Sequence, residues 1–277
     1  MTGGSGRIQV YWAVIDQTHV LARERMDAWL DDDERQRRVK FMREADRHLF
    51  GMAHGLLRLA LSHFAATVFL TPCHPSAWRY GVLPGGRPKV MPSASWPNGT
   101  PLPFFSLTHT QGAMAAVVAD YNDVGIDIER RDRKLGDFDI AARYFAPEEN
   151  AAIQAKIMAE RASERASERA ADLFFSYWTL KEAYVKALGA GLKKPLNSFA
   201  FTIPAATAAE GCITPSPALL YDRQNDVRAW RFRLWPSPAN YVTALAYRPP
   251  AYAGDPVSIF EWTGLTDLSG WKQVKSR

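Results

Sequence analysis

Two short segments carry acidic and basic residues at spacings that could support chemistry. Residues 124–129 read VGIDIE, and side chains alternate along a strand, so the apolar residues share one face while Asp127 and Glu129 share the other. Gly125 leaves the space beside Asp127 open. Two carboxylates on one face repel each other, and a cation relieves that repulsion. Taken alone, the segment is more typical of a polar strand face exposed to water.

The second segment is WTLKEAYVK, residues 178–186. On a helix, Trp178, Glu182 and Lys186 lie four residues apart on one stripe. Trp178 and Val185 can anchor the helix while Glu182 and Lys186 point into a neighbouring site. A surface ion pair between Glu182 and Lys186 is the alternative for this segment alone.

Two further pieces suit an anionic ligand. Thr108 and His109 stand at the end of a predicted strand before a tight turn, where His109 could donate to a phosphate; a structural histidine is the alternative. Gly85, Gly86, Arg87 and Pro88 form a turn, and a glycine-rich turn that carries an arginine can approach a nucleotide closely. A plain turn is the alternative there.

A stripe of basic residues lies on the first long predicted helix. Arg43, Arg47, His54 and Arg58 lie on one face at helical spacing, after a run that holds Arg35, Arg37, Arg38 and Lys40. The alternative is a solvated face opposite the apolar one. Arg58 differs because it stands among leucines, so we expect it to be buried and paired with an acid.

The strands and helices predicted to carry these residues indicate an α+β fold. We expect strands at residues 8–15, 102–107, 113–119, 124–129, 198–203, 229–235 and 241–247. We expect helices over 31–62 with Asp31 and Asp32 at its start, over 138–144, from Pro147, and over 172–190. Residues 71–101 predict loop, and the ERAS repeat at 160–170 predicts a solvated helix or a flexible insertion without chemistry. Helices and strands follow one another in a similar order on either side of residues 120–123, which suggests two similar halves.

Composition narrows the function. The formal net charge is +5, which suits an anionic partner, and no zinc-finger, homeodomain or RRM signature points to nucleic acid. No apolar run is long enough to span a bilayer and no secretory pattern opens the chain, so we expect a cytoplasmic protein without membrane contact. Cys73 and Cys212 have no metal-type spacing and are expected to be structural.

The order and combination of these motifs resemble a known family. GIDIE at 125–129 followed by WTLKEAYVKALGAGL at 178–192 is similar to the paired signatures of the Sfp-type 4′-phosphopantetheinyl transferases. The resemblance extends to residues 43–61, 86–88, 107–109, 142–145 and 195–199, and so covers roughly residues 8–247. Thr108 stands where the family often has serine, and the ERAS repeat and the tail beyond Pro250 have no counterpart.

The resemblance implies a fold of two similar α+β halves with the active site in the cleft between them. It places the first half at residues 1–120, the second at 121–250 and a C-terminal extension at 251–277. It implies that Asp127, Glu129 and Glu182 hold Mg²⁺ together with the pyrophosphate of coenzyme A. Lys181 and Lys186 would contact the pyrophosphate, while Arg47, Gly86, Arg87, Pro88, Thr108 and His109 would contact coenzyme A.

The implied reaction is transfer of phosphopantetheine from coenzyme A to a serine of an acyl, peptidyl or polyketide carrier protein. Asp127, Glu182 and Lys186 would be catalytic, with Glu182 the candidate base, and the enzyme is expected to be a monomer. Two alternatives stay open: a Mg²⁺-dependent hydrolase of coenzyme A or a nucleotide, and a non-catalytic module that binds coenzyme A or a carrier protein.

Overall fold

The structure is a computed structural model that describes residues 7–15, 20–84, 86–94, 96–132, 139–159, 166–204, 217–237, 240–250, 257–263 and 270–274. The chain forms two compact units. The first contains Met1–Val124 together with Pro250–Ser276, and the second contains Gly125–Pro249. The C-terminal residues therefore belong to the first unit and are not a separate extension, because β11 pairs with β1.

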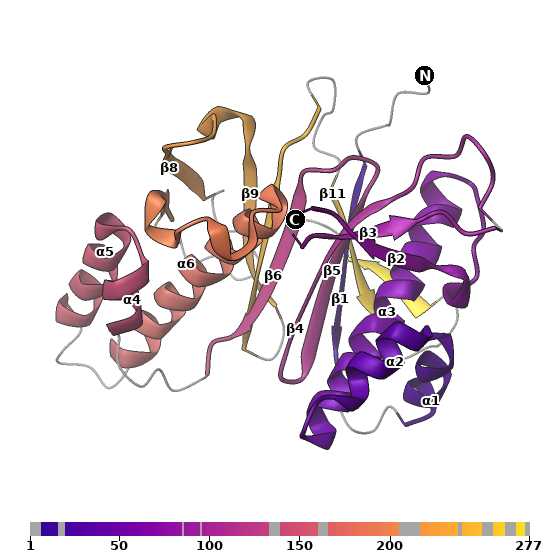
Figure 1. Ribbon diagram of the computed structural model, residues 1–277. Helices are drawn as coiled ribbons and strands as arrows, with labels where there is room; N and C mark the ends of the chain where they lie inside the picture. Colours follow the sequence, from indigo (N-terminus) through magenta and orange to yellow (C-terminus); the bar gives the residue numbers. More distant parts are fainter. Residues whose placement is uncertain are drawn as a thin grey trace. The chain divides into compact units, whose positions relative to one another are not determined.

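The first unit is built on a five-stranded sheet (Figure 1). Its order is β12 (Trp271–Val274), β11 (Val257–Trp262), β1 (Ile8–Val14), β5 (Ala113–Ala119) and β4 (Phe104–Thr110). The β1–β11 pair is parallel, and β5 pairs antiparallel with both β1 and β4. The predicted strand at 113–119 is confirmed in its full length, whereas β11 and β12 had no predicted counterpart.

Three helices cover this unit's sheet or pack on one another: α1 (Val20–Trp29), α2 (Asp32–Val39) and α3 (Glu44–Val68). The single helix predicted over 31–62 is wrong, because residues 40–43 interrupt it and Arg43 has an extended backbone. Two arginine side chains hold this break: Arg38 Nε donates to the Arg47 carbonyl and Arg47 Nε to the Phe41 carbonyl. The predicted helix start is confirmed, since Asp31 and Glu34 form a reciprocal capping box.

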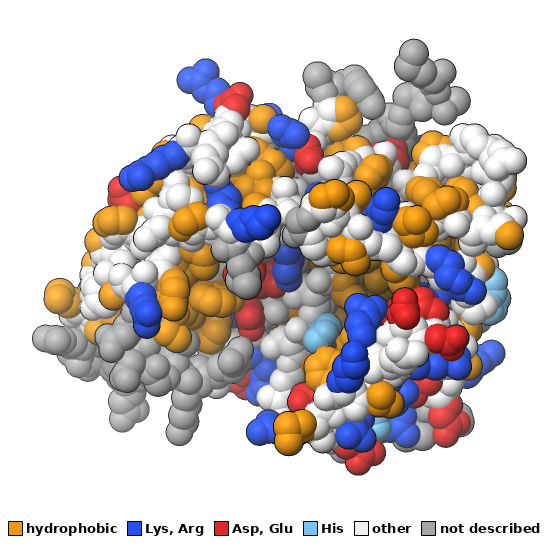
Figure 2. Space-filling view, in the orientation of Figure 1, with side chains coloured by type: hydrophobic (Ala, Val, Ile, Leu, Met, Phe, Trp, Pro, Cys, Tyr) orange, Lys and Arg blue, Asp and Glu red, His pale blue; other side chains and the backbone are white. Residues whose placement is uncertain are grey.

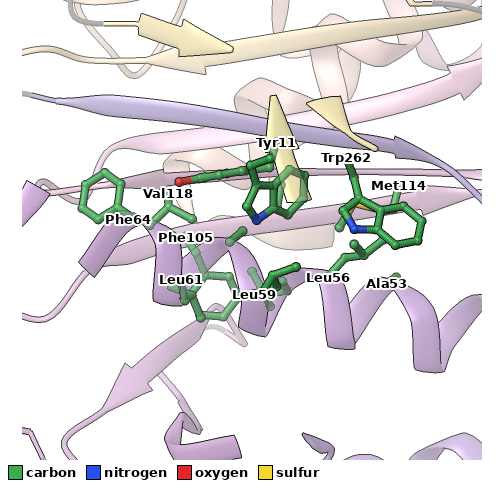
Figure 3. Close-up of a cluster of buried hydrophobic side chains, with 14 of the residues drawn as sticks. Tyr11, Ala53, Leu56, Leu59, Leu61, Phe64, Phe105, Met114, Val118 and Trp262 are labelled. Atoms are coloured by element: carbon green, nitrogen blue, oxygen red, sulfur yellow. The ribbon is translucent and has the colours of Figure 1, made fainter. Parts of the chain in front are cut away.

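The core of the first unit lies between α3 and the sheet. Figure 3 shows α3 side chains such as Leu56 and Phe64 pointing toward Tyr11 of β1 and Val118 of β5. Trp262 of β11 joins the same cluster, so the C-terminal strands complete the hydrophobic core. Burial of this apolar surface is the main force that holds the C-terminal segment to the first unit.

A hairpin lies within the predicted loop at 71–101. Strands β2 (Arg79–Val82) and β3 (Pro88–Met91) pair antiparallel, and Gly86 in their turn has φ +93°. That left-handed conformation favours glycine, so the turn chemistry was predictable although the flanking strands were not.

In its described residues, the second unit contains a three-stranded sheet, a two-stranded ribbon and three α-helices. The sheet order is β6 (Val124–Arg130), β10 (Tyr241–Tyr247) and β9 (Arg231–Ser237), and the ribbon joins β7 (Phe199–Thr202) to β8 (Ala218–Asp222). The helices are α4 (Asp139–Tyr144), α5 (Pro147–Ala159) and α6 (Ala166–Leu188). Helix α6 packs against β10 and β9 and against α5 (Figure 1).

The mixed α+β composition is confirmed. The predicted strand at 241–247 and the helix start at Pro147 are also confirmed. Residue 138 and residues 160–165 of the ERAS repeat lie outside the described residues, as does Cys212. Among the described helices, none is long and apolar enough to cross a membrane. Figure 2 shows basic, acidic and hydrophobic side chains mixed over α1 and α2, so the excess of basic residues forms no uniform patch there.

Candidate active site

Close contact between β6 and α6 creates the candidate site in the second unit. A Cβ added at Gly125 would overlap the Ala183 carbonyl oxygen and the Ala187 nitrogen and would lie 2.9 Å from Ala187 Cα. Any larger side chain would therefore push the helix away from the strand. The sequence suggested that Gly125 leaves space beside Asp127; the structure instead fills that space with the backbone of α6.

This approach brings Asp127 of β6 to Lys186 of α6. Lys186 Nζ lies 2.6 Å from Asp127 Oδ1 and also donates to the Ile126 carbonyl at 3.3 Å. Asp127 is buried, with 5% of its surface exposed, so the water-exposed strand face is wrong for this residue. The apolar residues on the other face, Val124, Ile126 and Ile128, are buried as predicted.

Glu182 lies within the electrostatic field of the same pair. Burial raises the pKa of the Glu182 carboxyl, the negative charge of Asp127 raises it further, and Lys186 acts in the opposite direction. The ion pair of Lys186 is made with Asp127, so α6 is not simply a helix carrying a surface pair between Glu182 and Lys186. A carboxyl with a raised pKa beside a second carboxyl is poised to bind a proton or a cation.

Glu129 follows Asp127 on the same face of β6 and is half-buried. Among the described residues, however, no group of three or more His, Cys, Asp and Glu side chains is placed to hold a metal ion. The structure thus brings together Asp127 and Glu182, and it does not assemble the three predicted carboxylates around one point.

The rest of α6 fixes the orientation of this stripe. Trp178 packs against the hydrophobic core of the second unit, with its ring centroid 6.2 Å from that of Phe145, and Val185 is buried, which agrees with the anchoring role predicted for Trp178 and Val185. Phe145 is buried and stacks on Phe174 as well. The apolar face of α6 is therefore held while Glu182 and Lys186 are directed toward β6.

Lys181 has a different position from the one predicted. Its side chain is 0% exposed, and its ammonium group donates to the carbonyls of Leu196 and Phe199 at 2.7 and 2.8 Å. It also pairs with Glu149 at 2.7 Å. Direct contact with a pyrophosphate is not compatible with this arrangement, because the group is enclosed and its donors are used by the protein.

Glu149 is the partner that the sequence interpretation missed. It is buried at the start of α5, where its carboxylate accepts from the backbone N–H groups of Ala146 and Phe201. The signal was present, since Pro147 at the first helical position with Glu149 two residues later is typical of a helix N-terminus. Its pairing with Lys181 depends on tertiary packing.

The candidate ligand residues of the first unit lie on three elements. Thr108 is buried and His109 is exposed, as expected for neighbours on strand β4. Arg87 donates to the carbonyls of Asn122 and Val124 at 2.7 and 2.9 Å, so part of its guanidinium group holds the turn that precedes β6. Gly86 and Pro88 flank it, both exposed.

The basic stripe divides into two kinds of arginine. Arg47 is half-buried near the start of α3, with its Nε bonded to the Phe41 carbonyl. Arg58 is fully buried and pairs with Glu34 and Asp31, which confirms its predicted burial and pairing. Only the first kind is partly accessible to a ligand.

Comparison with known proteins gives a consistent result. The family model of the 4′-phosphopantetheinyl transferase superfamily matches residues 123–246, which include β6, α6 and β10. A 4′-phosphopantetheinyl transferase of Bacillus subtilis is 28% identical over 193 residues, covering 69% of this chain and 75% of the relative.

Two further relatives carry similar names. The 4′-phosphopantetheinyl transferase HetI of Nostoc is 27% identical over 168 residues, which cover 60% of this chain and 62% of HetI. The 4′-phosphopantetheinyl transferase Sfp of Bacillus subtilis is 26% identical over 178 residues, which cover 64% of this chain and 67% of Sfp.

Proposed function

Because residues 123–246 belong to the 4′-phosphopantetheinyl transferase superfamily, we propose that this protein transfers the 4′-phosphopantetheine group of coenzyme A to a serine of a carrier protein. The observation that carries the proposal is the buried Asp127 of β6, placed 2.6 Å from Lys186 and within the field of Glu182. These three residues lie inside the segment that the family model matches.

The proposed reaction forms one bond and breaks another at phosphorus. The serine Oγ attacks the β-phosphorus of coenzyme A, and the bond from that phosphorus to the bridging oxygen breaks. Adenosine 3′,5′-bisphosphate leaves with the electron pair of that bond. Glu182, whose pKa burial and Asp127 raise, accepts the serine proton, and Lys186 neutralises the charge that develops on the leaving oxygen.

Asp127, Glu129 and Glu182 are the residues we assign to a divalent cation. Their fit rests on donor chemistry, because oxygen donors suit Mg²⁺. Burial raises the pKa of Glu182 and the negative charge of Asp127 raises it further, and a cation would relieve that repulsion. When bound, Mg²⁺ would neutralise charge on the pyrophosphate. Since Lys186 pairs with Asp127 and the described residues hold no ready group of three ligands, we expect Lys186 and Glu129 to adjust when the cation binds.

The remaining ligand contacts stay predictions. We assign Arg47, Arg87 and His109 to the phosphates of coenzyme A, because arginine and histidine suit phosphate recognition. Gly86, Pro88 and Thr108 would lie beside them. The cleft between two similar halves, a monomeric enzyme, a cytoplasmic location and an acyl, peptidyl or polyketide carrier as the acceptor also stay predictions.

Mass spectrometry of an apo carrier protein, incubated with the protein, coenzyme A and Mg²⁺, tests the proposal. We expect the serine to gain one phosphopantetheinyl group. An incubation without carrier separates transfer from hydrolysis, since a transferase releases little adenosine 3′,5′-bisphosphate alone. Rapid release without carrier would favour a hydrolase, and binding of coenzyme A without either product would favour a non-catalytic module.

A further inference from the structure

Lys181 and Glu149 form a completely buried ion pair next to Glu182 and Lys186, the reactive stripe of α6. Both side chains are 0% exposed, and Nζ lies 2.7 Å from Oε2. Lys181 also bonds the carbonyls of Leu196 and Phe199, and its ammonium lies 4.3 Å from the Phe199 ring centroid. One side chain of α6 thus reaches the segment that leads into β7.

Glu149 extends this junction to α5. Its two oxygens accept from the backbone N–H groups of Ala146, before α5, and of Phe201 in β7, at 3.0 and 2.8 Å. The pair therefore ties α6, α5 and β7 together through five polar contacts, of which the one to the Leu196 carbonyl is part-buried and the other four are buried.

The junction lies on the side of α6 that is turned away from β6. Successive helical residues are rotated by about 100°, so Lys181 and Ala183 point in nearly opposite directions. Ala183 and Ala187 form the close contact with Gly125, and Glu182 and Lys186 flank that contact. The helix is consequently held from two sides, by Gly125 on one and by Lys181 on the other.

Polar contacts compensate for the burial of both charges. The Lys181 ammonium and the Glu149 carboxylate lie 2.7 Å apart, the ammonium also donates to two backbone carbonyls, and the carboxylate accepts from two backbone N–H groups. Replacing a buried ion pair by well-packed apolar residues often costs no stability, whereas the pair supplies directional contacts that apolar side chains cannot make.

We propose that the Lys181–Glu149 pair is a positioning device that fixes the rotation and axial placement of α6, so that Glu182 and Lys186 meet Asp127. This inference rests on the proposed transferase function. It gives Lys181 no contact with substrate, and it makes Glu149 a positioning residue for the reaction although it lies outside the reactive stripe.

A double-mutant cycle on kcat tests the inference with three variants: Lys181→Met, Glu149→Gln and the two combined. If both residues act as one device, each single variant and the double variant lose the same factor, about 10- to 100-fold for a small misplacement of reactive groups. The double variant removes both charges together, so it remains folded if a single variant does not. Losses that multiply in the double variant, or a Lys181→Met variant with the kcat of the natural protein, overturn the inference.

Lys194 offers a matched control. It is another buried lysine of this unit, bound to Asp222 of β8 at 3.0 Å and 5.2 Å from the Phe199 ring. Asp222 also accepts from the Tyr184 hydroxyl of α6 at 2.8 Å, so this group joins α6 to β8 but not to α5. Lys194→Met leaves that hydrogen bond in place and is expected to keep kcat within about threefold. A loss in Lys194→Met as large as that in Lys181→Met would show a general effect of removing a buried charge and would also overturn the inference.

Hydrogen exchange separates this inference from the proposed function. We expect the backbone amides of residues 182–188 to exchange faster in the double variant than in the natural protein. In Lys194→Met, which keeps the Tyr184–Asp222 hydrogen bond, we expect a smaller increase in exchange. If the natural protein transfers nothing to any carrier, the proposed function fails, and the exchange result alone decides the positioning role. Unchanged exchange in the double variant would reject it.

Discussion

The two units each bury carboxylates beside a cation, and the difference between the two groups separates a structural cluster from a reactive one. In the first unit, Arg58 donates to Glu34 at 2.5 Å and to Asp31 at 3.0 Å, and to the carbonyls of Pro75 and Trp78 at 3.0 Å. Its guanidinium group is enclosed by acceptors, as a buried charge requires.

The acids of the two groups respond in opposite directions. Although burial opposes it, hydrogen bonding and the charges of His54 and Arg58 lower the pKa of Glu34 to about 2, so this acid stays ionised. In the second unit, burial and the charge of Asp127 raise the pKa of Glu182. In the first group the cations stabilise the ionised carboxylate of Glu34. In the second group the ionised form of Glu182 is disfavoured, and binding of a proton or a cation would stabilise this carboxyl group, as is common in active sites.

The largest expected effect that would distinguish the reactive group of the second unit from the structural cluster of the first is the loss of activity in Asp127→Asn. The substitution keeps the shape but removes the charge that pairs with Lys186, and preorganised charge is the main catalytic contribution here. We expect kcat to fall by about 10³-fold with little change in the thermal melt. Transfer to a carrier protein, followed by mass spectrometry, measures the loss.

Asp132→Asn is the control for that variant. Asp132 follows the same strand and pairs with Arg130, but it is exposed. Activity in Asp132→Asn should equal that of the natural protein. Equal activities in both variants would remove Asp127 from the reactive group.

The next largest expected effect is a loss of stability when Arg58 of the first unit is replaced. Arg58→Met leaves the Glu34 carboxylate buried without its main cation, so we expect the free energy of unfolding to fall by about 3–5 kcal/mol. Urea unfolding followed by circular dichroism measures it. Arg79→Met, which alters an exposed arginine of the same unit, is the control. A loss below about 1 kcal/mol in Arg58→Met would contradict the interpretation that Arg58, Glu34 and Asp31 form a cluster that stabilises the fold.

Local sequence patterns predicted the positions of Asp127, Glu182 and Lys186 better than the contacts that hold α6 in place. The period of two in residues 124–129 correctly predicted the buried apolar face, and helical spacing correctly placed Glu182 and Lys186 on one stripe. Arg58 could be predicted because a charge among leucines needs a partner. In each case neighbours along the chain decide the outcome.

The features that escaped prediction depend on distant parts of the chain. The role of Gly125 depends on the backbone of α6, and that of Lys181 on Glu149 and on carbonyls before β7. The C-terminal strands could not be assigned, because the parallel pairing of β11 with β1 joins opposite ends of the sequence. No spacing within a single segment carries that information.

The smallest effects are the pH dependences of stability, where the two groups should differ in sign. The folded pKa of Glu34, about 2, lies below its ordinary value of 4.5, so its stabilisation is present above pH 4.5 and is lost as the pH falls toward 2. We expect Glu34→Gln to lower the free energy of unfolding by about 3 kcal/mol at pH 7, with the difference shrinking in acid. The folded pKa of Glu182 is raised, so its contribution is present below its ordinary pKa of 4.5 and is lost as the pH rises through the folded value.

Glu182→Gln should therefore be slightly more stable than the natural protein at pH 7 and no more stable at pH 4, since the variant no longer holds a charge beside Asp127. Thermal melts of both variants and of the natural protein between pH 3 and 8 measure the two dependences. If Glu182→Gln were destabilised at neutral pH and Glu34→Gln unaffected, the contrast between the two groups would be reversed. The acid to be assigned to the reaction would then be sought in the first unit.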